Sequence, residues 1–453
     1  MPPALDSIFK AYDIRGTVPD QIDAELCRRI GAAFARFAES DRLLVAHDMR
    51  PSGPELAEAF AEGAAGQGVD VVDLGLASTD LMYFAAGHLD APGAMFTASH
   101  NPAQYNGIKL CLAGAKPVGQ DTGLAKVKQW AAEGLSPVEA RRGSVSQQDL
   151  LGVYADHVRS FVDVELLEPL HIVADTANGM GGLVAPAVFE GLPFTVEYLF
   201  AELDGTFPNH PPDPIQRENL RDLQAAVRER GADVGLAFDG DADRVFLVDQ
   251  DARPISGSLT TALVATGMLD KHPGATILYN LICSKAVPEV ILEHGGEPVR
   301  TRVGHSFIKQ TMAETGAVFG GEHSGHYYFR DNYRADSGLV AALVVLEQLS
   351  VAGVALSELV APLDRYANSG EINTPVDDPL ATIDAVAEAY ADGDADLDRL
   401  DGLTVDAGSW WFNLRPSNTE PLLRLNLEAP TTEECEARTT EVVELIRDVG
   451  GQE

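Results

Sequence analysis

The chain has 453 residues and a formal net charge of −36 at pH 7, and its content of 45% hydrophobic and 23% charged residues is typical of a globular protein. At roughly 150 residues per domain, this length predicts about three domains. The excess of acidic residues argues against binding of nucleic acid or an anionic membrane, so any phosphate site has to be built locally from a few cations and backbone amides.

Cysteine spacing and hydropathy indicate a protein of the reducing cytoplasm. The four cysteines are far apart in sequence and include no Cys-x-x-Cys pair, which argues against disulfides and a zinc cage. The first ten residues have no apolar core of a signal peptide, and no apolar run approaches the roughly 20 residues of a membrane helix. We therefore expect a cytoplasmic location.

Strand, helix and strand patterns recur three times along the chain. The first group comprises strands 43–46 and 69–74 around helix 54–66, the second strands 171–174 and 194–198 around helix 182–189, and the third strands 276–279 and 298–301 around helix 284–293. This repetition predicts an α/β fold, with three related α/β domains with mixed sheets and a smaller α+β C-terminal domain around a central cleft.

The expected domain boundaries lie near 150, 255 and 368. They divide the chain into residues 1–150, 151–255, 256–368 and 369–453. In the last domain we expect strands at 410–414 and 422–427 and a helix at 433–449. The acidic stretch 387–398 predicts an exposed helix and loop.

Three aspartates at alternate positions, Asp239, Asp241 and Asp243, follow the apolar stretch 234–238. Such carboxylates stay ionised together only when a cation is near, and ligands that are all oxygen favour Mg²⁺. An EF-hand is excluded, because Arg244 and Gln250 occupy the places of its glycine and glutamate. A phosphatase with an aspartate nucleophile and a solvated acidic turn remain as alternatives.

Ser99 lies in a short polar loop, 97–102, that follows the apolar residues 94–96. A serine at such a place is a candidate nucleophile, but it needs a base, a metal or a covalent phosphate to act. Lys109 lies ten residues on and could return beside Ser99 through a hairpin. The alternative is an ordinary polar turn.

Two later loops carry groups suited to a phosphorylated sugar. Glu322 and Ser324 lie in the loop 321–326 and suit vicinal hydroxyls, while zinc is the alternative ligand, although the spacing matches no usual zinc motif. The loop 415–421 offers an arginine fork and hydroxyl donors for phosphate, with a polar turn as the alternative.

These four loops, in this order, resemble the α-D-phosphohexomutase family, and within it the phosphomannomutase/phosphoglucomutase branch, over residues 12–421. The resemblance implies a phosphate on Ser99 and a Mg²⁺ ion held by that phosphoserine and the three aspartates. It implies catalytic roles for Arg15, Lys109, Arg244 and His305, with Lys109 favoured over His305 for moving the hydroxyl proton. The implied substrate-binding residues are Tyr12, Lys285, Glu322, Ser324, Arg415, Ser417, Asn418 and Thr419.

The implied reaction converts hexose 6-phosphate to hexose 1-phosphate, through a hexose 1,6-bisphosphate that is both intermediate and activator. Asn418 favours mannose as the first sugar and glucose as the second, whereas phosphoglucosamine mutases more often have glycine there. His323 departs from this branch, which often has methionine at that place. A phosphoglucosamine mutase, a Mg²⁺-dependent sugar phosphatase and a non-catalytic sensor remain as alternatives. Hexose phosphates are the expected partners of a monomer or homodimer whose last domain closes on substrate.

Overall fold

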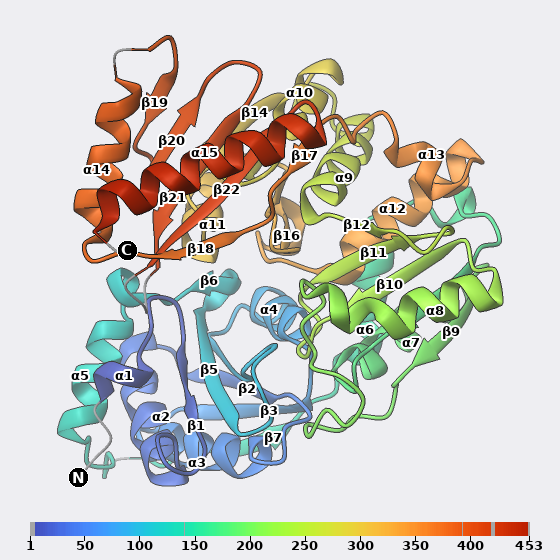
Figure 1. The fold of residues 1–453 in the computed structure, drawn as a ribbon. Coiled ribbons are helices and arrows are strands. Elements are labelled where there is room, and N and C mark those ends of the chain that lie inside the picture. The colour runs from blue at the N-terminus through green and yellow to red at the C-terminus, as the bar shows by residue number, and fades with distance from the viewer. Residues whose placement is uncertain (1–4, 140, 392, 418–421, 452–453) are drawn as a thin grey trace.

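The computed structural model describes residues 5–139, 141–391, 393–417 and 422–451. The chain forms four sheets in succession, and each of the first three combines parallel and antiparallel pairs with helices (Figure 1). This arrangement confirms the predicted α/β fold with mixed sheets and a distinct C-terminal part. We call the four parts that carry these sheets the first to fourth units.

The first unit has the strand order β1-β5-β4-β2-β3-β7, with β6 paired to β5. Strands β2, β3, β4 and β7 are parallel neighbours, and β5 runs antiparallel to β4 and β1. The strands are β1 (Ile14–Thr17), β2 (Arg42–His47), β3 (Asp70–Leu76), β4 (Gly93–Phe96), β5 (Tyr105–Leu112), β6 (Lys116–Pro117) and β7 (Val145–Gln147). The helices are α1 (Leu5–Ile8), α2 (Ala24–Ala38), α3 (Gly53–Gly66), α4 (Thr79–His88) and α5 (Leu124–Glu133), with the short η1 (Ala113–Ala115) and η2 (Gln120–Thr122).

The second unit has the strand order β12-β11-β10-β8-β9. Its strands are β8 (His171–Asp175), β9 (Thr195–Leu199), β10 (Val234–Phe238), β11 (Val245–Asp249) and β12 (Pro254–Ile255). Its helices are α6 (Leu151–Arg159), η3 (Val164–Leu166), α7 (Gly181–Phe189), η4 (Arg217–Leu220) and α8 (Arg221–Arg230). Strands β10 and β11 are buried throughout and form an antiparallel pair, so the loop between them is held at both ends by the sheet.

The third unit has the strand order β14-β13-β15-β16. Its strands are β13 (Thr276–Asn280), β14 (Glu297–Thr301), β15 (Phe319–Gly321) and β16 (Tyr327–Phe329). Its helices are α9 (Gly257–Lys271), α10 (Ala286–Glu293), α11 (His305–Thr315), η5 (Arg330–Asn332), α12 (Gly338–Ala352) and α13 (Leu356–Val360).

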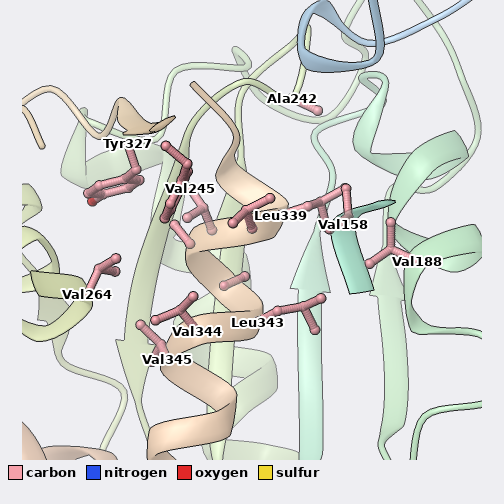
Figure 2. Close-up of a cluster of buried hydrophobic side chains, with 14 of the residues drawn as sticks. Val158, Val188, Ala242, Val245, Val264, Tyr327, Leu339, Leu343, Val344 and Val345 are labelled. Carbon is pink, nitrogen blue, oxygen red and sulfur yellow. The ribbon is translucent and has the colours of Figure 1, made fainter. Parts of the chain in front are cut away.

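Helix α12 packs the second and third units together. It is apolar on nearly all sides, as expected for a helix that lies inside a core. Figure 2 shows Leu339 pointing toward Val158 of α6, while Val345 lies on the side of Val264 of α9. One buried cluster extends from the first unit through the third, so these three units share a continuous core.

The fourth unit is an antiparallel sheet with its own core. Its strands are β17 (Ala367–Asn368), β18 (Ile372–Pro375), β19 (Asp396–Asp398), β20 (Leu403–Asp406), β21 (Trp411–Pro416) and β22 (Leu422–Ala429), and its helices are α14 (Pro379–Tyr390) and α15 (Thr432–Gly450). The expectation of an exposed helix and loop over 387–398 holds for the end of α14 and the exposed described residues that follow it. It is wrong only at residues 396–398, which pair with β20 as an edge strand.

All four cysteines are buried and free, which agrees with the prediction of no disulfide. In the part of the chain that the structure describes, no helix combines the length and apolar character that crossing a membrane requires.

Candidate active site

The serine loop and the aspartate loop lie against each other, although they are 140 residues apart in sequence. Ser99 follows β4 in a left-handed backbone conformation, with φ of 49°, and its Oγ donates a hydrogen bond to Asp239 Oδ2 at 2.7 Å. The Nη2 of Arg244 donates to the same Oγ at 3.2 Å. Gly240 makes this approach sterically feasible, because a Cβ there would lie 2.4 Å from the carbonyl oxygen of Ser99.

Arg50, which the sequence analysis missed, holds the serine loop in shape. Its side chain is buried, and its Nε donates to Asp48 Oδ2 at 3.2 Å. Its remaining four N–H groups donate at 2.7 to 2.9 Å to the carbonyl oxygens of Ser99, Asn101, Pro102 and Tyr105. In the sequence, this role could have been indicated only by a charged pair, Asp48 and Arg50, that directly follows a buried strand. The guanidinium therefore holds four carbonyls of the loop at once, including that of the buried Ser99.

Oxygen atoms from Asp239, Asp241 and Asp243 lie within 4.8 Å of one another, and all three residues are fully buried. Lys109 Nζ donates at 2.7 Å to Oδ2 of Asp241 and of Asp243. The Oδ1 atoms of Asp241 and Asp243 are buried and make no hydrogen bond within the described ranges. Free buried carboxylate oxygens close to one another are the donor set of a hard divalent cation, so these residues fit a metal ion.

The charges of this cluster are strongly coupled. Burial raises the pKa of Asp239 to about 7, even though the Arg244 guanidinium opposes that shift. Burial would also raise the pKa of Asp241, but the Lys109 ammonium outweighs it and the net shift is downward. The pKa of Lys109 is correspondingly raised well above its usual value, because its two carboxylates outweigh burial.

Lys109, the expected proton carrier, lies against the aspartate loop. The antiparallel pairing of β4 and β5 does place it opposite Met95, as the predicted hairpin requires. Its ammonium contacts Asp241 and Asp243, so it also offsets the charge of the aspartates.

His326 and Asp336 form a buried pair beside the aspartate loop, and neither residue was singled out from the sequence. His326 Nδ1 lies 2.9 Å from Asp336 Oδ2, and His305 Nδ1 lies 3.5 Å from the same oxygen. Burial would lower the pKa of His326, but Asp243 and Asp336 outweigh it and raise the value. Burial lowers the pKa of His305 well below its usual value, and the neighbouring His326 adds to that shift. In the sequence, only the place of His326 as the second histidine of the loop 321–326 could have indicated its role.

Glu322 is buried next to this histidine pair. Its Oε2 accepts a hydrogen bond from the Tyr328 hydroxyl at 2.8 Å, and its Oε1 accepts one from Gly304 N at 3.2 Å. The Tyr328 hydroxyl also lies 2.8 Å from His305 Nδ1. Glu322 is therefore fixed in one orientation, and the half-buried Ser324 follows it in the same loop.

Tyr12 and Arg15 approach the same region from the start of the chain. Arg15 Nη1 donates to Asn101 Oδ1 in the serine loop at 2.6 Å. Tyr12 contacts Phe307 edge to face, and both residues line a pocket of about 390 Å³ between the first and third units. Tyr12 thus lies where a ligand between these units would meet it.

Arg415 belongs to β21 of the fourth unit, and Lys285 of the third unit contacts that unit. Burial lowers the pKa of Arg415, and its Nη2 lies 3.6 Å from Glu371 Oε2. Lys285 Nζ binds Asp406 Oδ1 at 2.9 Å, which joins the third unit to the fourth. Ser417 directly follows the last residue of β21. The predicted phosphate ligands Asn418 and Thr419 lie outside the described residues.

Comparison with known proteins gives the same family over the whole length of the chain. Residues 6–134, 152–253 and 256–366 match the family models for the alpha/beta/alpha domains I, II and III of phosphoglucomutase/phosphomannomutase. Residues 371–445 match the model for the C-terminal domain of that family.

Individual relatives are similar over nearly the full chain. A protein of Xanthomonas campestris pv. campestris described as phosphohexose mutases is 42% identical over 443 residues, which are 97% of this chain and 99% of the relative. A phosphomannomutase of Salmonella montevideo is 40% identical over 448 residues, covering 97% and 98%. The crystal structure of a phosphoglucomutase/phosphomannomutase family protein from Burkholderia thailandensis superposes with a TM-score of 0.90 at 34% identity, covering 99% and 98% of the two chains.

Proposed function

The chain belongs to the phosphoglucomutase/phosphomannomutase family, and from this premise we propose that it interconverts mannose 6-phosphate and mannose 1-phosphate, with glucose phosphates as second substrates. It is a phosphohexomutase, an isomerase that moves a phosphoryl group within a sugar. The preference for mannose is supported by relatives that are named phosphomannomutases.

The observation that carries the proposal is the contact between Ser99 Oγ and Asp239 Oδ2 at 2.7 Å. It joins a hydroxyl on the first unit to a cluster of carboxylates on the second. In the proposed cycle Ser99 starts as a phosphoserine and gives its phosphoryl group to the free O1 or O6 of a hexose phosphate. The products of this half-reaction are the serine hydroxyl and a hexose 1,6-bisphosphate, and the second half-reaction returns the other phosphate to Ser99.

Asp239, Asp241 and Asp243 would hold a Mg²⁺ ion together with one oxygen of the phosphoserine. When bound, Mg²⁺ supplies positive charge that offsets the charge of the phosphoryl group during transfer. Arg244 contributes further, because its guanidinium already contacts both Ser99 Oγ and Asp239. These contacts explain how a chain of net charge −36 can receive a phosphorylated sugar.

In the first half-reaction the attacking sugar hydroxyl loses a proton and the leaving Ser99 Oγ gains one. In the second half-reaction the Ser99 hydroxyl loses a proton and the leaving sugar oxygen gains one. We assign the exchange of the sugar's proton to the pair of His326 and Asp336. In the proposed tautomer, His326 Nδ1–H donates a hydrogen bond to Asp336 Oδ2, so Nε2 is the ring nitrogen that can accept the proton. The neutral His305 next to it is the second candidate, since its ring centre lies 4.2 Å from that of His326. Lys109, whose ammonium contacts Asp241 and Asp243, remains a candidate as well and offsets the charge of the aspartates.

The bisphosphate has to turn over between the two half-reactions, so one site must accept it in two orientations. Glu322 and Ser324 would hold the sugar hydroxyls in both orientations. Arg415, Ser417, Asn418 and Thr419, with Lys285, would hold the phosphate that does not react. Opening of the fourth unit, whose core is separate from that of the other units, would give the intermediate room to turn.

Intact mass measurement tests the phosphoserine directly. After incubation with glucose 1,6-bisphosphate, we expect one added phosphate that maps to Ser99, and the Ser99→Ala variant should gain none and lose its mutase activity. A phosphatase acting through Asp239 would keep releasing inorganic phosphate in that variant. Rates on the 1-phosphates of mannose, glucose and glucosamine, measured side by side, test the sugar preference.

A further inference from the structure

Asp241 is held by two groups of a single residue in another unit. The Oγ1 of Thr79 donates to Asp241 Oδ2 at 2.5 Å, and the backbone N–H of Thr79 donates to the main-chain oxygen of Asp241 at 3.0 Å. Thr79 is the first residue of α4 in the first unit, and Asp241 lies in the aspartate loop of the second. Both residues are fully buried.

The two oxygens of the Asp241 carboxylate have different surroundings. Oδ2 accepts hydrogen bonds from Thr79 and from Lys109, at 2.5 and 2.7 Å. Oδ1 is buried and has no hydrogen-bond partner in the described ranges. Because both donors lie on one oxygen, they fix the rotation of the carboxylate and leave the other oxygen free for a cation.

Asp80, the next residue, anchors the start of α4 to the two other units of the shared core. Its Oδ2 accepts hydrogen bonds from the hydroxyl of Tyr154 on α6 and, at 2.8 Å, from that of Ser337 at the start of α12. Its Oδ1 accepts from Ser78 and, at 2.9 Å, from Leu81 N. This arrangement ties Thr79 to all three units that share the large core.

We propose that Thr79 is a positioning residue that orients the Asp241 carboxylate for the metal ion, with Asp80 and Tyr154 fixing the helix start from which it acts. The inference rests on the proposed function, since it assumes that the three aspartates bind a divalent cation. It adds a contribution of the first unit to the metal centre that is separate from Ser99.

Binding of Mn²⁺ to the purified protein without substrate, measured by electron paramagnetic resonance, tests this role. Thr79→Val removes the hydroxyl but keeps the shape of the side chain and the backbone N–H. We expect it to weaken Mn²⁺ binding about 10- to 100-fold, as removal of partners of metal ligands generally does. Thr79→Ser restores the hydroxyl and should recover most of the affinity.

Two further variants separate positioning from general destabilisation. Thr266→Val removes a buried hydroxyl from α9 whose hydrogen-bond partners are Leu263 O and Gln348 Oε1 and not an aspartate, and should leave Mn²⁺ affinity unchanged. Tyr154→Phe loosens the Asp80 anchor without touching Asp241, and should weaken Mn²⁺ binding less than Thr79→Val does. Should the valine variant prove unstable, Thr79→Ala removes the same hydroxyl and is expected to show the same loss.

The possible results distinguish this inference from the proposed function. Equal Mn²⁺ affinity of Thr79→Val, or Thr79→Ala, and the wild type would overturn the positioning role while leaving the metal site intact. A wild type that binds no Mn²⁺ would instead refute the metal site itself. A Michaelis constant for hexose phosphate that stays constant in Thr79→Ser and Thr79→Val, while the Mg²⁺ requirement rises only in the latter, would support the inference.

Discussion

Arg50→Lys tests whether one buried guanidinium determines the shape of the serine loop. Arg50 uses all five of its N–H groups, one on Asp48 and four on loop carbonyls. The carbonyl of Ser99 itself is among them, at 2.8 Å, and Ser99 has a left-handed backbone that needs support from its surroundings. Lysine keeps the positive charge, so the substitution changes the number and geometry of donors rather than the charge.

The magnitude follows from counting donors and acceptors. An ammonium has at most three N–H groups, so at least two of the five acceptors lose their partner in the variant. An unsatisfied buried acceptor costs about 1–3 kcal/mol, and an acceptor that water can reach costs less, so we expect a loss of about 1–6 kcal/mol in the free energy of unfolding.

Guanidinium-induced unfolding measures the stability loss, and phosphorylation of Ser99 by glucose 1,6-bisphosphate, followed by intact mass, measures its local effect. Arg28→Lys is the matched control, because Arg28 is exposed and pairs with Glu25 and Glu62 on the surface. It should change stability by no more than about 0.5 kcal/mol. An Arg50→Lys variant as stable as Arg28→Lys, and phosphorylated like the wild type, would refute the argument.

Three other substitutions test separate contacts. His326→Gln should lower kcat by about 10²- to 10⁴-fold without changing Mn²⁺ affinity, and an unchanged kcat would exclude His326 as the proton carrier. Burial raises the pKa of Asp80 to about 6. The protonated Asp80 carboxyl therefore contributes its full stabilisation below the unfolded pKa of about 3.9. This contribution is lost as the pH rises through about 6, which lowers the free energy of unfolding by about 3 kcal/mol. Asp80→Asn should remove this part of the pH dependence of unfolding, and a profile identical to that of the wild type would contradict the shift. Gly240→Ala places a Cβ 2.4 Å from the Ser99 oxygen and should slow phosphorylation of Ser99, whereas Gly152→Ala, where nothing lies within 4 Å, should not; equal rates in both would contradict the close approach.

The order of strands and helices was readable from local patterns. Apolar runs such as 171–174 and 276–279 are strands in the structure because buried parallel strands need continuous apolar side chains. In the acidic stretch 387–398 only the short edge strand at 396–398 was missed, because it depends on pairing with β20. Short strands with exposed side chains have no pattern of their own.

The sequence by itself determined the α/β fold, the family and the four loops, because each loop is a contiguous run whose residue types already suit one kind of ligand. Only the tertiary structure decided how these loops support one another. Arg50 binds the Ser99 carbonyl 49 positions away, and Thr79 binds Asp241, 162 positions away, through hydrogen bonds that no local spacing encodes. The charge state of Lys109 was likewise set by two carboxylates that folding brings to its ammonium.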